Sequence, residues 1–97
     1  PRWNFLLLAV NQLVNHLDRL PIYSDYRPHV IVRVAAPSKT PLDPQAQHDG
    51  DFTDAVQNMC RTLSFVRLEN ADGIVPAYEQ ALHSEGSTVL VEYTRLY

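Results

Sequence analysis

The sequence contains one cysteine, three glycines and eight basic residues among its 97 positions. A single cysteine cannot form an internal disulfide, so we expect a reducing, cytoplasmic setting. The three glycines, Gly50, Gly73 and Gly86, stand far apart, which excludes a glycine-rich loop that cradles phosphates. Eight Lys and Arg against eleven Asp and Glu give a net charge of −3, so a nucleic-acid partner is not expected.

Long apolar runs and metal-ligand spacings are also missing. The longest apolar candidate, residues 5–10, is far shorter than the roughly 18 residues of a membrane span, so no membrane partner is expected. No Cys pair or His-x-x-x-His spacing exists, and no serine stands on a Gly-x-Ser-x-Gly turn, which argues against a metal site and a serine hydrolase. The histidines are scattered: His16, His29, His48 and His83.

Apolar residues make up 45% of the chain and charged residues 20%, which is typical of a globular domain. Apolar spacings of three and four predict helices, and β-branched runs between them predict strands. We expect a first helix at about residues 5–19, begun by Asn4 and stopped by Pro21. A second helix is expected at 51–60, begun by Asp51. A third is expected at 72–83, begun by Asn70 or Asp72 and ended by Gly86. We expect strands at residues 29–35, 63–68 and 87–93.

Strands that alternate with helices of this length indicate crossover connections and therefore a parallel sheet with helices on its faces. The fold class is thus α/β, with three layers and a partial, doubly wound, mostly parallel sheet. Five of the seven residues at 29–35 are apolar on both faces, so this strand is expected to be central. Arg33 within it is expected either to reach solvent or to meet a buried anion.

Aromatic and sulfur side chains in the helices have two interpretations each. Trp3 and Phe5, at the entry of the first helix, are expected to pack in the core, and the alternative is an aromatic wall of a pocket. Cys60 has apolar neighbours along its helix, which favours a buried structural thiol over a nucleophile.

The long polar loop from Pro37 to Asp51 is the strongest candidate for a site. Loops of this length without secondary structure are usually functional or disordered, and three prolines stiffen this one. His48 lies near its end, where Asp49 and Asp51 are placed to orient or charge the imidazole. The loop follows the carboxyl end of a strand, the place where open parallel sheets bind ligands. His48 is therefore the candidate catalytic residue, and a solvated surface histidine is the alternative.

Four stretches resemble the central, pyrimidine-binding domain of the transketolase-like thiamine diphosphate enzymes, nearest the beta subunit of the thiamine-dependent component of the 2-oxoacid dehydrogenases. The segment Asn4-Phe-Leu-Leu-Leu-Ala-Val-Asn-Gln-Leu-Val-Asn15 is similar to the family's Asp-(Tyr/Phe) helix that ends in Asp-Gln-(Ile/Leu)-Val-Asn. Val30-Ile-Val-Arg33 resembles its Val-Ile-Arg strand, Gln47-His48 its His-Ser-Gln-Ser turn, and the segment from Thr88 to Tyr97 its closing strand with Glu and a terminal Leu-Tyr.

The resemblance covers nearly the whole chain in the same order, and it implies a role for His48 beside the cofactor's reactive ring and the substrate. This loop departs from the family in being proline-rich and in having Asp49-Gly50-Asp51 after the histidine. The family's cofactor-activating glutamate lies in an upstream Glu-x-Gly-Ile segment that these 97 residues do not contain. The family holds the diphosphate and its Mg ion with a different domain.

Residues 1–97 are therefore expected to be a single domain, an incomplete pyrimidine-binding domain of a larger enzyme. The parent would use thiamine diphosphate with Mg on a 2-oxoacid, while this chain alone would bind no cofactor and be inactive. Its partner would be the rest of the enzyme or an alpha-type subunit, and the apolar faces left uncovered would favour an oligomer. The alternative is a small non-catalytic α/β module that binds a ligand or a partner.

Overall fold

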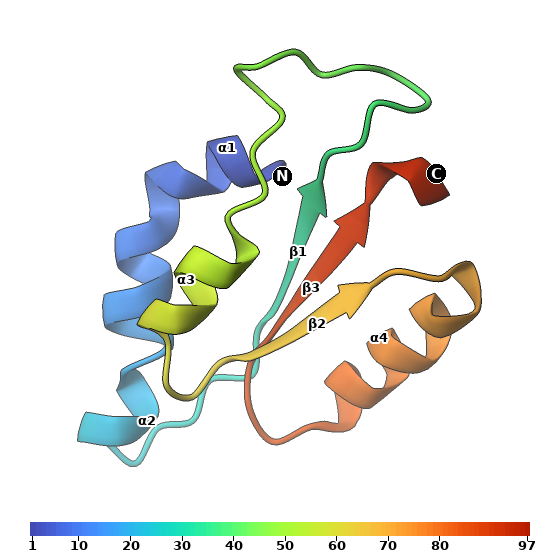
Figure 1. Ribbon diagram of the computed structural model, residues 1–97. Helices are drawn as coiled ribbons and strands as arrows, with labels where there is room; N and C mark the ends of the chain where they lie inside the picture. The colour runs from blue at the N-terminus through green and yellow to red at the C-terminus, as the bar shows by residue number, and fades with distance from the viewer.

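The computed structural model describes residues 1–97 as a three-stranded parallel sheet with helices on both faces, as the sequence predicts (Figure 1). The helical segments before the first strand are α1 (Trp3–Leu6), η1 (Leu7–Ala9), η2 (Gln12–Leu17) and α2 (Leu20–Tyr23). The remaining elements are β1 (Ile31–Ala36), α3 (Thr53–Met59), β2 (Ser64–Leu68), η3 (Ala71–Gly73), α4 (Ile74–His83), β3 (Thr88–Tyr93) and η4 (Thr94–Leu96). No helix combines the length and the apolar character that crossing a membrane requires.

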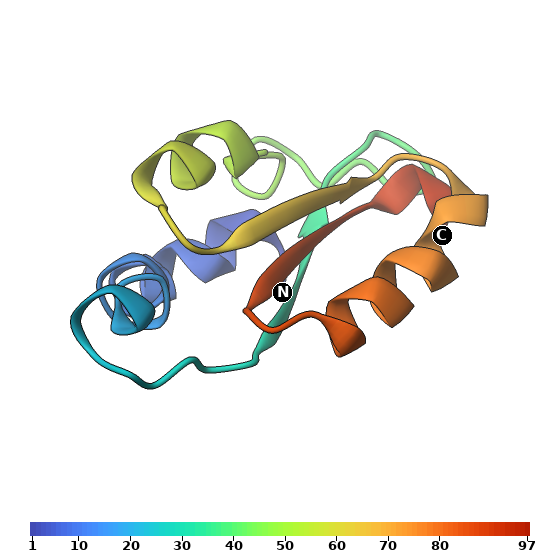
Figure 2. The same ribbon diagram turned by 90° about the horizontal axis from the view of Figure 1, so that it is seen from below.

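The strands lie in the order β1-β3-β2, and both pairings are parallel. Val34 of β1 faces Val91 of β3, and Val66 of β2 faces Leu90 of β3. The connection from β1 to β2 crosses the sheet in one direction, and the connection from β2 back to β3 crosses it in the other. When both connections are right-handed, their helices α3 and α4 lie on opposite faces of the sheet. Figure 2 shows α4 on one side of the sheet and the other helices on the other side.

The prediction that the first strand is central is wrong. β1 lies at an edge, where its outer side meets only an isolated bridge between Arg2 and Ala35, and β3 occupies the centre. Five of the six residues of β3 are buried, whereas the side chain of Arg33 in β1 is 65% exposed. Both strands are β-branched and apolar, so their composition does not distinguish them.

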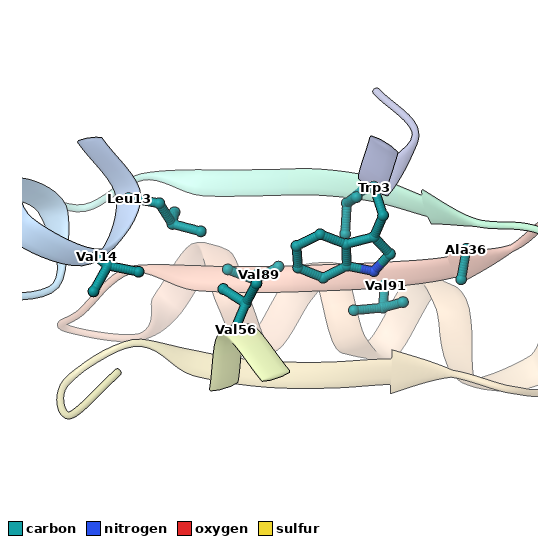
Figure 3. Close-up of a cluster of buried hydrophobic side chains, with 8 residues drawn as sticks. Trp3, Leu13, Val14, Ala36, Val56, Val89 and Val91 are labelled. Atoms are coloured by element: carbon teal, nitrogen blue, oxygen red, sulfur yellow. The ribbon is translucent and has the colours of Figure 1, made fainter. Parts of the chain in front are cut away.

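The main core lies between the sheet and the helices that precede β2 (Figure 3). Trp3 is fully buried in it and packs with valines from β1, β3 and α3, and the cluster comprises Trp3, Leu13, Val14, Val34, Ala36, Val56, Val89 and Val91. A smaller cluster of Leu68, Ala81 and Leu90 lies under α4 on the other face. Core packing is therefore the role of Trp3, as predicted.

The first helical segment starts earlier and ends later than predicted. It begins at Trp3, and Asn4 does not cap it but accepts a hydrogen bond from the Gly50 backbone N–H at 3.2 Å. Pro21 does not stop it, because Pro21 falls in the first turn of α2, where its missing N–H has no intrahelical partner to lose. Asp18, just after η2, is fully buried.

The other boundaries differ from the predicted ones by at most two residues. The N-cap of α3 is Phe52, although the Asp51 carboxylate still accepts a hydrogen bond from the Thr53 backbone N–H at 3.1 Å. Helix α4 starts at Ile74 after the short turn η3, and it ends at His83 before an extended Ser84. Gly86 is therefore not its stop, and no glycine has a positive φ.

Candidate functional site

The loop after β1 returns toward α1 at the end of the sheet where β1 stops (Figure 1). His48, near the end of this loop, lies against Phe5 of α1. The imidazole of His48 stacks on the ring of Phe5, with centroids 5.3 Å apart and planes inclined by 14°. His48 is half-buried, and its Nδ1 atom is buried without a hydrogen-bond partner. Phe5 is 56% exposed, so it forms part of a surface wall beside His48 instead of packing in the core.

Hydrogen bonds donated by backbone N–H groups order this loop. The His48 backbone N–H donates to the carbonyl of Gln45 at 2.9 Å, and the Ser38 N–H donates to Oγ1 of Thr94 at 2.9 Å. Gly50 lies so close to the ring of Phe52 that a Cβ atom there would stand 2.4 Å from Cζ. Any larger residue at position 50 would displace the Phe52 ring, so glycine suits this position near His48.

Asp51 does not act on the imidazole in the way the sequence suggests. One carboxylate oxygen of Asp51 accepts a hydrogen bond from Oγ1 of Thr53 at 2.5 Å, and the other lies 3.6 Å from Nη1 of Arg67. Thr53 in turn accepts the indole N–H of Trp3 at 2.9 Å. Asp51 therefore fixes the start of α3 against Trp3. Asp49 makes no contact with Nδ1 of His48, because that atom has no partner.

A second polar cluster, which sequence reasoning did not single out, surrounds Glu92 near the end of β3. Oε1 of Glu92 accepts hydrogen bonds from Nε of Arg33 at 2.8 Å and from the hydroxyl of Tyr78 at 2.5 Å. Oε2 accepts the hydroxyl of Tyr97 at 2.9 Å. Arg33 thus meets a buried anion while most of its guanidinium stays in solvent, so both predicted environments apply.

The charges in this cluster stabilise one another. Burial acts to raise the pKa of Glu92, but the hydrogen bonds from Arg33, Tyr78 and Tyr97 outweigh it, so the pKa lies below its usual value. Burial and the bond to Glu92 raise the pKa of Tyr78 to about 12. The signal in the sequence was two charged interruptions, Arg33 and Glu92, of opposite sign in two apolar strands.

Asp18 forms a third polar centre at the opposite, amino-terminal end of the sheet. Its carboxylate accepts backbone N–H groups from Arg61, Thr62 and Leu63 at 2.8–3.0 Å. Burial opposes ionisation, but these hydrogen bonds lower the pKa of Asp18 below its usual value. Nearby Cys60 is half-buried, and burial raises its pKa to about 11, which favours the inert thiol.

Some sequence-predicted site residues are brought together and others are not. His48 is close to Phe5, whereas His16 and His83 are exposed on helices and His29 bonds through Nε2 to the Ala81 carbonyl at 2.9 Å. No three His, Cys, Asp or Glu side chains converge as metal ligands would. Comparison with protein-family models, curated proteins and solved structures finds no match to the chain.

Proposed function

We propose that this chain is part of a thiamine diphosphate-dependent 2-oxoacid dehydrogenase, in its beta-subunit-like decarboxylating component, or of a transketolase-like enzyme, and that His48 serves its reaction. The observation that carries the proposal is the position of His48, whose Nδ1 is buried without a partner beyond the carboxyl end of β1. Buried polar atoms are nearly always hydrogen-bonded, so an unpartnered one is a candidate for a group supplied by a ligand.

The stacking on Phe5 gives the imidazole a fixed orientation without using either ring nitrogen. A histidine held in this way is free to donate or accept a proton through a nitrogen that points at a bound substrate. Such proton transfer typically contributes about a hundredfold to ten-thousandfold in rate. Phe5 would then be a positioning residue, and His48 the residue that touches the reacting group.

The residues present fit only one wall of a thiamine diphosphate site. His48 and Phe5 offer an aromatic surface, but the part of the chain near them has neither a glycine-rich phosphate loop nor a converging set of metal ligands. When bound, the cofactor supplies a nucleophilic carbon that adds to a 2-oxo group. The aminopyrimidine-binding glutamate, the diphosphate site and its Mg ion would come from the rest of the enzyme or from an alpha-type subunit, in a cytoplasmic oligomer.

The proposal is tested first on the chain by itself. Calorimetric titration of the 97-residue chain with thiamine diphosphate and Mg should show no saturable binding at micromolar concentration, because the residues that hold the diphosphate lie elsewhere. Tight binding by this chain alone would contradict that division of the site. A Glu-x-Gly-Ile segment encoded upstream in the same gene would support it.

The role of His48 is tested in the enzyme assembled with its partner. His48→Ala should leave folding and cofactor binding close to unchanged while turnover of the 2-oxoacid falls at least about a hundredfold. His83→Ala is the matched control, since His83 is exposed at the end of α4, far along the chain from the loop. Near wild-type turnover by His48→Ala at saturating substrate would exclude the catalytic role.

A non-catalytic module that binds a partner is the second candidate, and one observation favours it. Phe5 in α1 and Leu7 and Leu8 in the adjoining η1 are 56%, 45% and 88% exposed, an unusual group of apolar side chains in contact with water. In that case His48→Ala would change no activity, and Leu8→Ser would weaken association with the partner.

A further inference from the structure

A hollow of about 250 Å³ opens beside β1. It lies on the same side of the sheet as α4, opposite Trp3 and the main core, in a part that α4 does not cover. It is lined by Pro1, Arg2, Arg33, Ala35, Glu92 and Tyr97. Two arginines thus face a space that the small side chain of Ala35 leaves open. The hollow lies near the carboxyl ends of β1 and β3, where parallel sheets bind ligands.

Arg2 is fixed at this place by its backbone. It forms a parallel bridge with Ala35, and the Ala35 N–H donates to the Pro1 carbonyl at 2.7 Å, so the chain start adds a short strand segment to the edge of β1. Ala35 is in turn paired with Glu92 of β3. Arg2, Ala35 and Glu92 therefore form one row across the sheet, with the smallest side chain in the middle.

Both guanidinium groups have hydrogen-bonding capacity to spare. Nη1 of Arg2 is buried without a hydrogen-bond partner, which is costly for a charged donor unless a ligand satisfies it. Arg33 uses Nε for Glu92, and its side chain is 65% exposed. Glu92 makes no hydrogen bond with Arg2; the hydrogen bonds to its carboxylate come from Arg33, Tyr78 and Tyr97.

We propose that this hollow is a binding site for a small carboxylate anion, held over Ala35 between the guanidinium groups of Arg2 and Arg33. Planar guanidinium donors match the two oxygens of a carboxylate. The side chains of Arg2, Arg33 and Glu92 together carry a charge of +1, so one monoanion neutralises the site, whereas a doubly charged phosphate leaves an excess of negative charge beside Glu92. The site is separate from His48, so this proposal does not depend on the proposed function.

The test uses acetate and inorganic phosphate as probes of the 97-residue chain, with its amino terminus acetylated so that Pro1 carries no charge. The Nε–H resonances of the arginines are followed by ¹⁵N NMR during titration at constant ionic strength. Acetate should shift the resonances of Arg2 and Arg33 saturably and leave that of Arg61 unchanged, since Arg61 is exposed near the other end of the sheet. Phosphate should bind more weakly than acetate.

Variants separate the site from general attraction of anions to a cationic surface. Arg2→Gln should weaken acetate binding at least about tenfold, the loss typical of a charge-assisted hydrogen bond. Ala35→Leu keeps every charge but fills the hollow, so it should abolish the saturable shift at Arg33. Arg61→Gln is the matched control and should bind acetate like the unmodified chain.

Three results would overturn the proposal: a shift that does not saturate, equal affinity of Arg2→Gln and the unmodified chain, or tighter binding of phosphate than of acetate. Arg2→Gln decides the question even if Ala35→Leu disturbs the sheet, because the Arg2 side chain lies at the sheet edge and takes no part in either apolar cluster.

Discussion

Asp18 and His48 lie at opposite ends of the same sheet, and both place a polar group out of water. The carboxylate of Asp18 is surrounded by donors from three consecutive backbone amides, together with Nε of Arg19 at 3.3 Å. Nδ1 of His48 has none. The two atoms differ in one respect: the satisfied carboxylate fastens a loop to a helix, and the unsatisfied nitrogen is the atom that we propose is bound by a group from outside the chain.

The same division applies to the arginines of the carboxyl edge. Arg67 bonds to the hydroxyl of Tyr93 and to the carboxylate of Asp54, and it serves to join β2 to β3 and to α3. Nη1 of Arg2 has no such partner. Structural polar groups and candidate binding groups therefore differ in whether their hydrogen bonds are complete.

The largest effect is expected from Asp18→Ala. It removes the acceptor of three backbone N–H groups, and hydrogen bonds to a charged acceptor are worth more than neutral ones, so we expect a loss of about 3 kcal/mol in the free energy of unfolding. Urea denaturation measures it. Asp18→Asn keeps one suitable oxygen and should lose less. A change below about 0.5 kcal/mol, the usual size for an ordinary surface substitution, would show that the amides are satisfied by water instead.

Thr53→Val should have the next largest effect. The hydroxyl of Thr53 links the buried indole N–H of Trp3 to the carboxylate of Asp51, and valine leaves the indole N–H without an acceptor. An unsatisfied buried donor costs about 1–3 kcal/mol. Thermal or urea unfolding detects the loss, and Thr53→Ser, which retains the hydroxyl, is the control. Equal stability of the valine and serine variants would be the contrary result.

Acid should destabilise the chain gradually. The pKa of Asp18 and that of Glu92 lie below their usual values of 3.8 and 4.5 in the folded state, so the folded chain binds fewer protons than the unfolded chain. The resulting stability is complete above the usual values and is lost as the pH falls through the folded-state pKa of each group. Unfolding curves between pH 6 and pH 2 should show this decline, and the slope should be smaller in Asp18→Asn. An unchanged slope would exclude Asp18 as a cause.

The smallest effect on stability is expected from His48→Ala. The variant loses one stacked contact with Phe5, which is worth about 0.5–1.5 kcal/mol at most, and it leaves no carboxylate or amide without a partner. We expect a loss below about 1 kcal/mol by urea denaturation. Phe5→Ala should cost a similar amount. A loss near that of Asp18→Ala would mean that His48 holds the loop in place, and the contrast between the two residues would disappear.

The sequence was sufficient for the class of fold and for most element positions, because apolar periodicity reports which side chains face a core. It was not sufficient for the order of strands. The residues of β1 and β3 read alike, and only the path of the connections decides that the last strand enters between the first two. Pro21 was misread for a related reason, since its effect depends on whether it falls in the first turn or the interior of a helix.

The candidate site was only partly accessible to sequence reasoning. The length and proline content of the loop drew attention to His48, but its stacking on Phe5 joins residues 43 positions apart along the chain. The burial of Asp18 could not be foreseen, because its partners come from a turn more than forty residues later. Arg33 and Glu92 were visible as opposite charges in apolar strands, yet their pairing depends on β1 and β3 being neighbours.

The position of β3 also determines when the sheet can form during synthesis. Every strand pairing in the sheet involves Thr88–Tyr93, and β1 and β2 never touch each other as strands. Within residues 1–97, the first two strands therefore have no strand partner until the third has been translated. Until then the apolar faces of β1 and β2 are open to chaperones and to other nascent chains. Residues 1–87 by themselves contain no pair of strands that bond to each other.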